Sequence, residues 1–151
     1  MFGTMKRGVN AYANVGLETG IASASPHKLI VMLYDGALVA LLNAKSNIAA
    51  GNIAAKGKAL SHAITIIDNG LRASLDKKAG GEIAANLDAL YDYMSRRLLH
   101  ANLKNDVTVI DEVHRLLADL RGAWVAIGDK VQAPVPDASL AMPKAPTLVS
   151  A

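Results

Sequence analysis

Between Ser25 and Ile48 the chain carries more apolar residues than one face of a helix can hold. Alternating steps of three and four residues define one stripe, formed by Ile30, Leu33, Ala37, Leu41, Ala44 and Ile48. Five more apolar residues fall outside that stripe: Val31, Met32, Leu38, Val39 and Leu42. A helix that is apolar on more than one side is buried on more than one side. We therefore predict a helix that packs into a bundle and offers a second apolar face to a partner.

The ends of this helix are also marked in the sequence. Ser25 is a good N-cap, and Pro26 suits the first helical position, where its missing N–H costs nothing. Gly51 is a natural C-terminal cap, and Asn52 can cap the next helix immediately. So short a connection predicts that these two helices are antiparallel neighbours.

Three further segments have the apolar spacing of amphipathic helices. The second helix ends in the sequence DKKAGG, where Lys77 and Lys78 suit the negative end of the helix dipole. The third opens at Gly81, and the fourth starts between Asp106 and Thr108. Their apolar seams are, in order, Ile53, Gly57, Leu60, Ile64, Ile67, Leu71 and Leu75; Ile83, Leu87, Leu90, Met94, Leu98 and Ala101; and Ile110, Val113, Leu117, Leu120, Trp124, Ile127 and Val131.

These segments predict an all-α fold, an antiparallel four-helix bundle over residues 25–133. Residues 1–24 are polar and dotted with glycine, and we expect them to form a flexible N-terminal segment or a cap on the bundle. Four of the five prolines lie in residues 134–151, and this composition predicts a disordered tail.

Composition excludes several classes of partner. The net charge is +3, and sixteen Lys and Arg are scattered among thirteen acidic residues without the basic stripe that nucleic-acid binding requires. The chain has no cysteine, which excludes disulfides and thiolate metal sites and suits a reducing cytoplasm. The apolar region from Leu29 to Ala44 is interrupted by Asp35 and is shorter than the roughly 20 residues of a membrane span. We expect a soluble, cytoplasmic protein that binds no nucleic acid and does not insert into membranes.

The residues that could carry chemistry do not gather into a recognisable site. Asp111 and His114 have the spacing of half a di-iron motif, but a bundle di-iron site needs that motif twice and two further carboxylates. The chain has too few glutamates for this: Glu18, Glu82 and Glu112. The four histidines lie on different segments: His27, His62, His100 and His114. We therefore expect no metal, no cofactor and no catalytic site, and the chain is not expected to be an enzyme.

The surplus apolar positions are candidates for a binding groove between helices. Gly36 inside a helix costs about 1 kcal/mol relative to alanine, which indicates either a closely packed neighbouring helix or a partner chain lying against that position. In the sequence Tyr91-Asp92-Tyr93, one tyrosine can face the core while the other stays at the surface. Some surplus positions simply widen the core. The candidate groove residues are Val31, Tyr34, Gly36, Leu38, Leu42, Ile66, Tyr93 and Leu116.

Three segments, read in order, resemble the flagellar secretion chaperone family: SPHKLIVMLYDGAL (25–38), GGEIAANLDALYDYMSRRLLHAN (80–102) and DEVHRLLADLRGAW (111–124). The resemblance extends from Tyr12 to Val131. It implies a helical bundle that binds the disordered C-terminal segment of flagellin in apolar grooves in the cytoplasm. It also implies that binding prevents premature polymerisation and keeps flagellin competent for the flagellar type III export gate.

An apolar groove exposed before cargo arrives would favour aggregation. Val9, Tyr12 and Val15 are isolated apolar residues in a polar segment, and they could fold back as a cover that cargo displaces. A plain terminal segment without this role is the alternative. The main competing function is a dimerisation or adaptor bundle without flagellin cargo, and the cargo-free chain could be a monomer or a homodimer.

Overall fold

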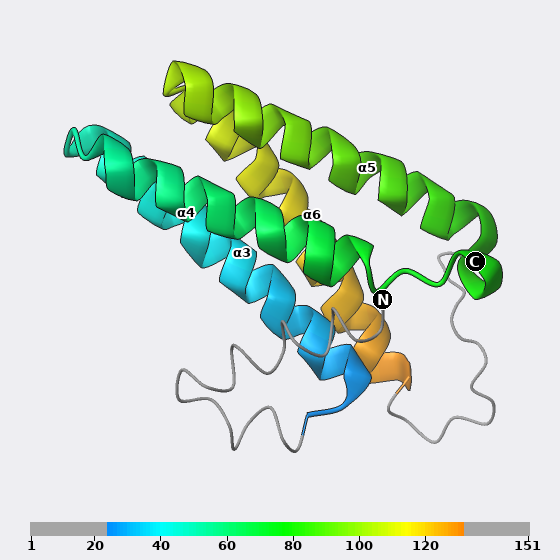
Figure 1. Cartoon of the computed structure of the whole chain (residues 1–151). Coiled ribbons are helices and arrows are strands. Elements are labelled where there is room, and N and C mark those ends of the chain that lie inside the picture. The colour runs from blue at the N-terminus through cyan, green and yellow to red at the C-terminus, as the bar shows by residue number, and fades with distance from the viewer. Residues whose placement is uncertain (1–23, 132–151) are drawn as a thin grey trace.

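The computed structural model describes residues 24–131, and Figure 1 shows that they form long helices packed side by side. The elements are α3 (Pro26–Ala49), α4 (Ile53–Thr65) with its continuation η2 (Ile66–Arg72), α5 (Lys77–Lys104) and α6 (Val107–Val131). Helix α3 packs against α4 and α6, and α5 packs against η2 and α6. The predicted antiparallel four-helix bundle is therefore confirmed.

The predicted boundaries of the first helix are confirmed. The Ser25 hydroxyl accepts a hydrogen bond from the backbone N–H of Lys28 at 3.1 Å, and Pro26 occupies the first helical turn. After a two-residue turn through Gly51, whose φ is +75°, the Asn52 side chain accepts from the backbone N–H of Ala55 at 3.3 Å. Both helix starts follow from a local side-chain bond to an otherwise unpaired backbone N–H group.

The connection between the second and third helices differs from the prediction. The helix that begins at Ile53 passes into a π-helix, η2, and ends at Arg72. Lys77 and Lys78 do not lie at its end but begin α5, because the Asp76 carboxylate accepts from the backbone N–H groups of Lys78 and Ala79 at 3.1 and 2.9 Å. A carboxylate at an N-cap outweighs the weaker preference of lysine for a helix C-terminus.

Helix α5 carries a kink close to its start. Gly81 has φ +55° and ψ −129°, a conformation open to glycine because it lacks a Cβ atom. The expected opening of the third helix at Gly81 is therefore an internal break between a first short turn and the long part of α5. Helix α6 begins within the predicted range, and the Asp106 carboxylate caps it by accepting from the backbone N–H of Val109 at 3.3 Å.

Most of the predicted seam positions lie in the core. The fully buried side chains with the largest volume are Leu41, Leu60, Ile67, Leu71, Met94, Leu98, Ile110, Leu117 and Val113. Ile53 and Ile83 are exceptions, with 52% and 53% of their surface exposed. Ile53 opens α4 and Ile83 follows the kink, so both lie at helix ends where there are fewer neighbouring side chains.

Helix α3 is long and apolar enough to cross a membrane when length and composition alone are considered. The apolar region from Leu29 to Ala44 is shorter than a membrane span, but the helix that contains it runs from Pro26 to Ala49. A core helix of a bundle has the same two properties, and α3 contributes Leu33, Leu41 and Ala44 to the core. Packing against α4 and α6 accounts for the buried part of this apolar composition, which is 33% of its most apolar stretch.

Candidate functional site: the apolar surface of α3

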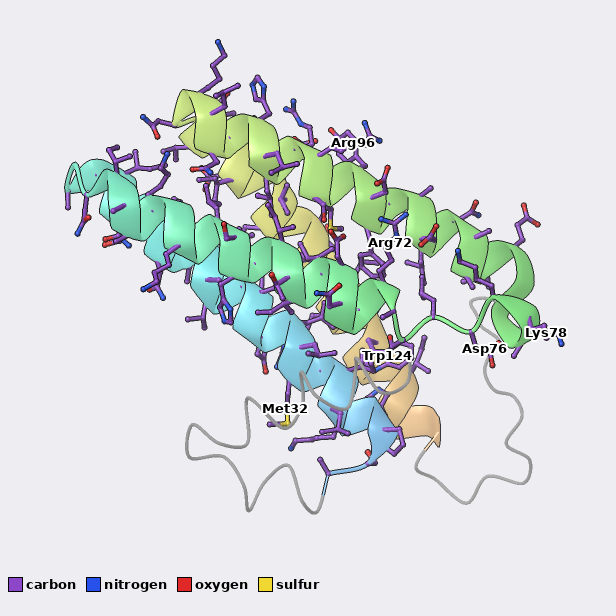
Figure 2. All side chains as sticks on the ribbon, in the orientation of Figure 1. Met32, Arg72, Asp76, Lys78, Arg96 and Trp124 are labelled. Carbon is purple, nitrogen blue, oxygen red and sulfur yellow. The ribbon has the colours of Figure 1, made fainter. Side chains whose placement is uncertain are left out.

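Helix α3 keeps part of its apolar surplus at the surface. Val39 and Leu42 are 55% and 50% exposed, although the opposite side of the same helix is buried in the core. The two residues are three positions apart, so they are neighbours on the helix surface. Met32 extends outward from α3 two turns before them (Figure 2). We call Val39, Leu42 and the half-buried Leu38 the α3 surface.

Two ion pairs hold α3 against α6 on either side of this surface. Asp35 pairs with Arg121 at 2.5 Å, and Lys45 pairs with Asp111 at 2.6 Å. Asp35 and Lys45 are ten positions apart on α3, and their partners Arg121 and Asp111 are ten positions apart on α6. Both pairs therefore fit one antiparallel register of the two helices. Leu38 and Leu42 fall between the two pairs along α3. Partly exposed pairs contribute at most about 1 kcal/mol each, so their main consequence here is alignment of the two helices.

His27 and Trp124 contact each other where the first turn of α3 packs against α6. The Trp124 indole N–H donates to the backbone carbonyl of His27 at 3.1 Å, and His27 Nε2 donates to the carbonyl of Trp124 at 2.6 Å. The two rings are stacked, with centroids 5.1 Å apart and planes within 9°. Gly128 is buried beside them, and a Cβ atom at that position would overlap the His27 ring. The start of α3 is therefore fastened to α6.

Two of the candidate groove residues lie inside the bundle and do not reach the surface. Tyr34 is 3% exposed, and its hydroxyl shares a hydrogen bond of 2.6 Å with that of Tyr91. Burial raises the pKa of both tyrosines, so both hydroxyls stay protonated. Ile66 is also 3% exposed and belongs to the core. Apolar periodicity alone cannot distinguish a core position from a groove position, and Tyr34 and Ile66 both belong to the core.

Two further candidates lie on the opposite flank of α6, where it meets α5. The Tyr93 hydroxyl donates to the Glu112 carboxylate at 2.5 Å, and Arg97 donates to the same carboxylate at 3.1 Å. The hydrogen bond from Tyr93, assisted by Arg97, lowers the pKa of Glu112. Leu116 is half-buried against the core. As predicted, one tyrosine of the pair at 91 and 93 faces the core and the other lies near the surface.

The remaining candidates belong to α3 itself. Val31 is 9% exposed, while Gly36 and Leu38 are half-buried. The eight candidate residues are therefore distributed over α3, the core and the α5–α6 contact, and they do not line one groove. Val39 is one of the surplus apolar residues but not one of the eight candidates, although its three-residue spacing from Leu42 places the two side by side on the helix surface. Val9, Tyr12 and Val15 lie outside the described residues.

The side chains that define the α3 surface, Leu38, Val39 and Leu42, are all apolar. Over residues 24–128, His, Asp and Glu side chains form no group of three or more that could hold a metal ion. In the same part of the chain, every buried side-chain nitrogen and oxygen has a hydrogen-bond partner. Asp92 forms an ion pair with Arg96, one turn later on α5, at 3.0 Å. Asp111, which has the spacing of half a di-iron motif with His114, forms its ion pair with Lys45 of α3.

Comparison with known proteins gives one consistent result. The model of the family described as flagellar protein FliS matches residues 8–131. The flagellar secretion chaperone FliS of Salmonella typhimurium is 56% identical over 123 residues, which cover 82% of this chain and 91% of that protein. The Escherichia coli protein of the same name is 48% identical over 78% of this chain and 87% of its own length. The Bacillus subtilis protein of the same name is 36% identical over 71% of this chain and 78% of its own length. The chain belongs to the FliS family of flagellar secretion chaperones.

Proposed function

We propose that this chain is a cytoplasmic export chaperone whose α3 surface binds the disordered C-terminal segment of flagellin. Binding would prevent premature polymerisation and keep flagellin competent for export through the flagellar type III gate. Family membership supports the chaperone role, and the resemblance of three sequence segments to the family supports flagellin as the cargo. The chain acts in this proposal by binding alone, without catalysis or a cofactor.

The observation that carries the proposal is the exposure of Val39 and Leu42 on a helix that is otherwise built into the core. An amphipathic cargo helix can place its own apolar face on such a surface. The ordering of a disordered segment costs about 2–5 kcal/mol. At about 25 cal/mol per Å², burial of on the order of 200 Å² of apolar surface offsets the upper end of that cost. The ion pairs beside Leu38 and Leu42 keep the surface in place before cargo arrives.

The N-terminal segment supplies a second part of the proposal. Val9, Tyr12 and Val15 precede α3 and could cover its apolar surface in the cargo-free chain. Cargo would then have to displace this cover. Deletion of residues 1–20 is expected to tighten the binding of a flagellin peptide, measured by titration calorimetry. Unchanged or weaker binding would remove the cover from the proposal and leave the α3 surface as the site.

The binding test uses a peptide from the C-terminal segment of flagellin, titrated against the full chain. Leu42→Glu is expected to weaken binding by about 2 kcal/mol or more, since it places a charge on an apolar contact. Leu38→Glu should act in the same direction, with an added loss of stability because Leu38 is half-buried. Leu103→Glu is the matched control, because Leu103 is 79% exposed and lies on α5, which packs mainly on α6, η2 and α4.

Light scattering distinguishes a chaperone from a dimerisation module. A chaperone forms a one-to-one complex with the peptide and gains helical signal in circular dichroism. A dimerisation bundle is a dimer without peptide and ignores it. Equal binding by wild type and Leu42→Glu would rule out the α3 surface as the cargo site.

A further inference from the structure

The two ion pairs between α3 and α6 fix which residues of the two helices lie opposite one another. One pair joins Asp35 to Arg121, and the other joins Lys45 to Asp111. Side chains three positions apart on a helix are neighbours on its surface. A step of three positions inward from each pair, taken along both helices, therefore reaches side chains that face each other across the α3–α6 contact.

Four side chains lie at these inner positions. On α3 they are Leu38 and Leu42, and on α6 they are Ala118 and His114. Leu38 is opposite Ala118, and Leu42 is opposite His114. Leu42 is exposed, and the other three are half-buried. We call these four residues the α3–α6 patch, in which His114 is the one polar side chain.

A cargo helix that lies on Leu38 and Leu42 also contacts α6. With its side chains an α-helix is about 10–12 Å across, and packed helices have their axes about 8–10 Å apart. A helix seated on the two leucines is therefore wide enough to lie over both α3 and α6. The small side chain of Ala118 leaves room for it, and the ring of His114 lies beside the contact that Leu42 makes.

No free acidic group lies beside His114 to hold a positive charge there. His114 forms no hydrogen bond, ion pair or ring contact with another described residue. The charged residues near it are Asp111 and Arg115 on its own helix and Lys45 on α3. The Asp111 carboxylate is paired with Lys45, and Glu112 lies on the opposite flank of α6, where it binds α5. The acid and the arginine at the far end of the patch are likewise bound to each other.

The α3–α6 patch therefore suits an apolar cargo face while His114 is neutral. A charged imidazole would be covered by the apolar side chains of the cargo without an acidic partner, and burial of an unpaired charge is costly. The positive charge of the neighbouring Arg115 adds to this cost.

We propose that His114 completes the cargo site on α6 and makes the affinity for cargo depend on its own charge. The inference rests on the proposed function and adds a titratable contact residue to the same site. Histidine is the side chain whose charge ordinarily changes between about pH 5 and about pH 8. The free chain can take up a proton at His114, whereas the complex excludes it. Affinity is therefore highest above this range and falls as the pH falls.

The test titrates the flagellin C-terminal peptide against the full chain at about pH 7.5 and about pH 5.5, with fluorescence anisotropy as the measurement. The wild-type affinity should fall by about threefold to tenfold between the two conditions. Because the peptide can titrate as well, variants at residue 114 isolate the effect. His114→Gln keeps a neutral polar side chain and should bind nearly equally at both pH values. His114→Lys is charged at both and should bind about tenfold more weakly at both.

Two further measurements accompany the titration. His100→Gln is the matched control, because His100 is an exposed histidine on α5, outside the proposed site. This variant should keep the wild-type pH dependence. The imidazole resonances of His114 should shift when peptide is added near neutral pH, as expected for a contact residue. Melting temperatures of all variants verify that each is folded under both conditions.

Three results would overturn the inference and leave the proposed function standing, because the peptide still binds in each. They are a wild-type affinity that is equal at both pH values, a full wild-type decrease retained by His114→Gln, and wild-type affinity in His114→Lys. Absence of peptide binding at both pH values, or binding that Leu42→Glu leaves unchanged, is a different outcome. It would remove the α3 surface as the cargo site and this inference with it.

Discussion

The hydroxyl groups of Tyr34 and Tyr91 share a hydrogen bond of 2.6 Å across the core, joining α3 to α5. These two helices are diagonal in the bundle, since each packs mainly on α6 and on the α4–η2 segment. The tyrosine pair thus places a polar link in the centre of an otherwise apolar core. Both rings are almost fully buried, at 3% and 2% exposure. Each hydroxyl is the hydrogen-bond partner of the other.

Removal of one hydroxyl from this pair should destabilise the fold more than removal of both. Tyr34→Phe leaves the buried Tyr91 hydroxyl without a partner, which costs about 1–3 kcal/mol. Tyr91→Phe should have a similar effect. The double variant leaves no orphaned group and is expected to recover most of the loss. Urea unfolding of the four proteins measures this directly, and strictly additive losses would contradict the pairing.

The kink in α5 gives a second prediction. Gly81→Ala places a Cβ on a backbone with φ +55° and ψ −129°, and such strain costs about 1–3 kcal/mol. Gly122→Ala is the matched control within α6, where nothing lies within 4 Å of the added Cβ. That control should stabilise the chain by about 0.5–1 kcal/mol. Thermal unfolding is the measurement, and equal shifts in both variants would mean that the kink is not required.

The fold was predictable because its signals are local or periodic. Ser25 and Asn52 mark helix starts through bonds to N–H groups three residues away, so the sequence alone contains both partners. At Asp76 the sequence contains a competing signal, since a glycine pair follows four and five residues later and glycine also marks helix ends. The π-helix η2 was not predictable, because its apolar residues also fit an ordinary helix.

The site was less predictable, because exposure depends on what packs beside a helix. Tyr34 and Leu42 were equally good candidates by spacing, yet Tyr34 is 3% exposed and Leu42 is 50% exposed. Tyr34 lies on the core side of α3, where its hydroxyl meets that of Tyr91 on α5. The Asp35–Arg121 pair was equally hidden, because 86 residues separate its partners. Such contacts follow from the register of α3 against α6, which the sequence pattern leaves open.

Acid should destabilise the link between η2 and α5. Arg72 donates to Asp88 at 2.6 Å, and Figure 2 shows its side chain extending toward α5. This hydrogen bond holds the pKa of Asp88 below its usual 3.8. A carboxyl with a lowered pKa in the folded state stabilises the fold above its unfolded-state pKa, and this contribution is lost as pH falls through the lower, folded-state value.

Asp88→Asn should therefore be less stable than wild type near neutral pH, and the difference should shrink in acid. Urea midpoints measured from about pH 7 to about pH 2 test this. Asp119→Asn is the control, because Asp119 is exposed on α6 and forms no ion pair with another described residue. A difference in urea midpoint between wild type and Asp88→Asn that stays constant below pH 3.8 would contradict the role of Arg72.

The stacked pair at the start of α3 can be tested through the only tryptophan of the chain. Gly128→Ala introduces a Cβ where the His27 ring lies, so the ring must move and the two hydrogen bonds with Trp124 are disturbed. Each bond contributes about 0.5–1.5 kcal/mol, and the variant should lose stability in that range or somewhat above it. The emission of Trp124 should shift, because its stacking partner is displaced.

A double variant identifies the cause of that loss. In a His27→Ala background no ring occupies the space beside residue 128, so Gly128→Ala should cost nothing there. It should even add stability, because alanine is the better helix former by about 1 kcal/mol. A change of sign between the two backgrounds is thus the expected result of the unfolding measurements. An equal loss in both would show that Gly128 is needed for another reason, and that the His27–Trp124 contact does not fasten α3 to α6.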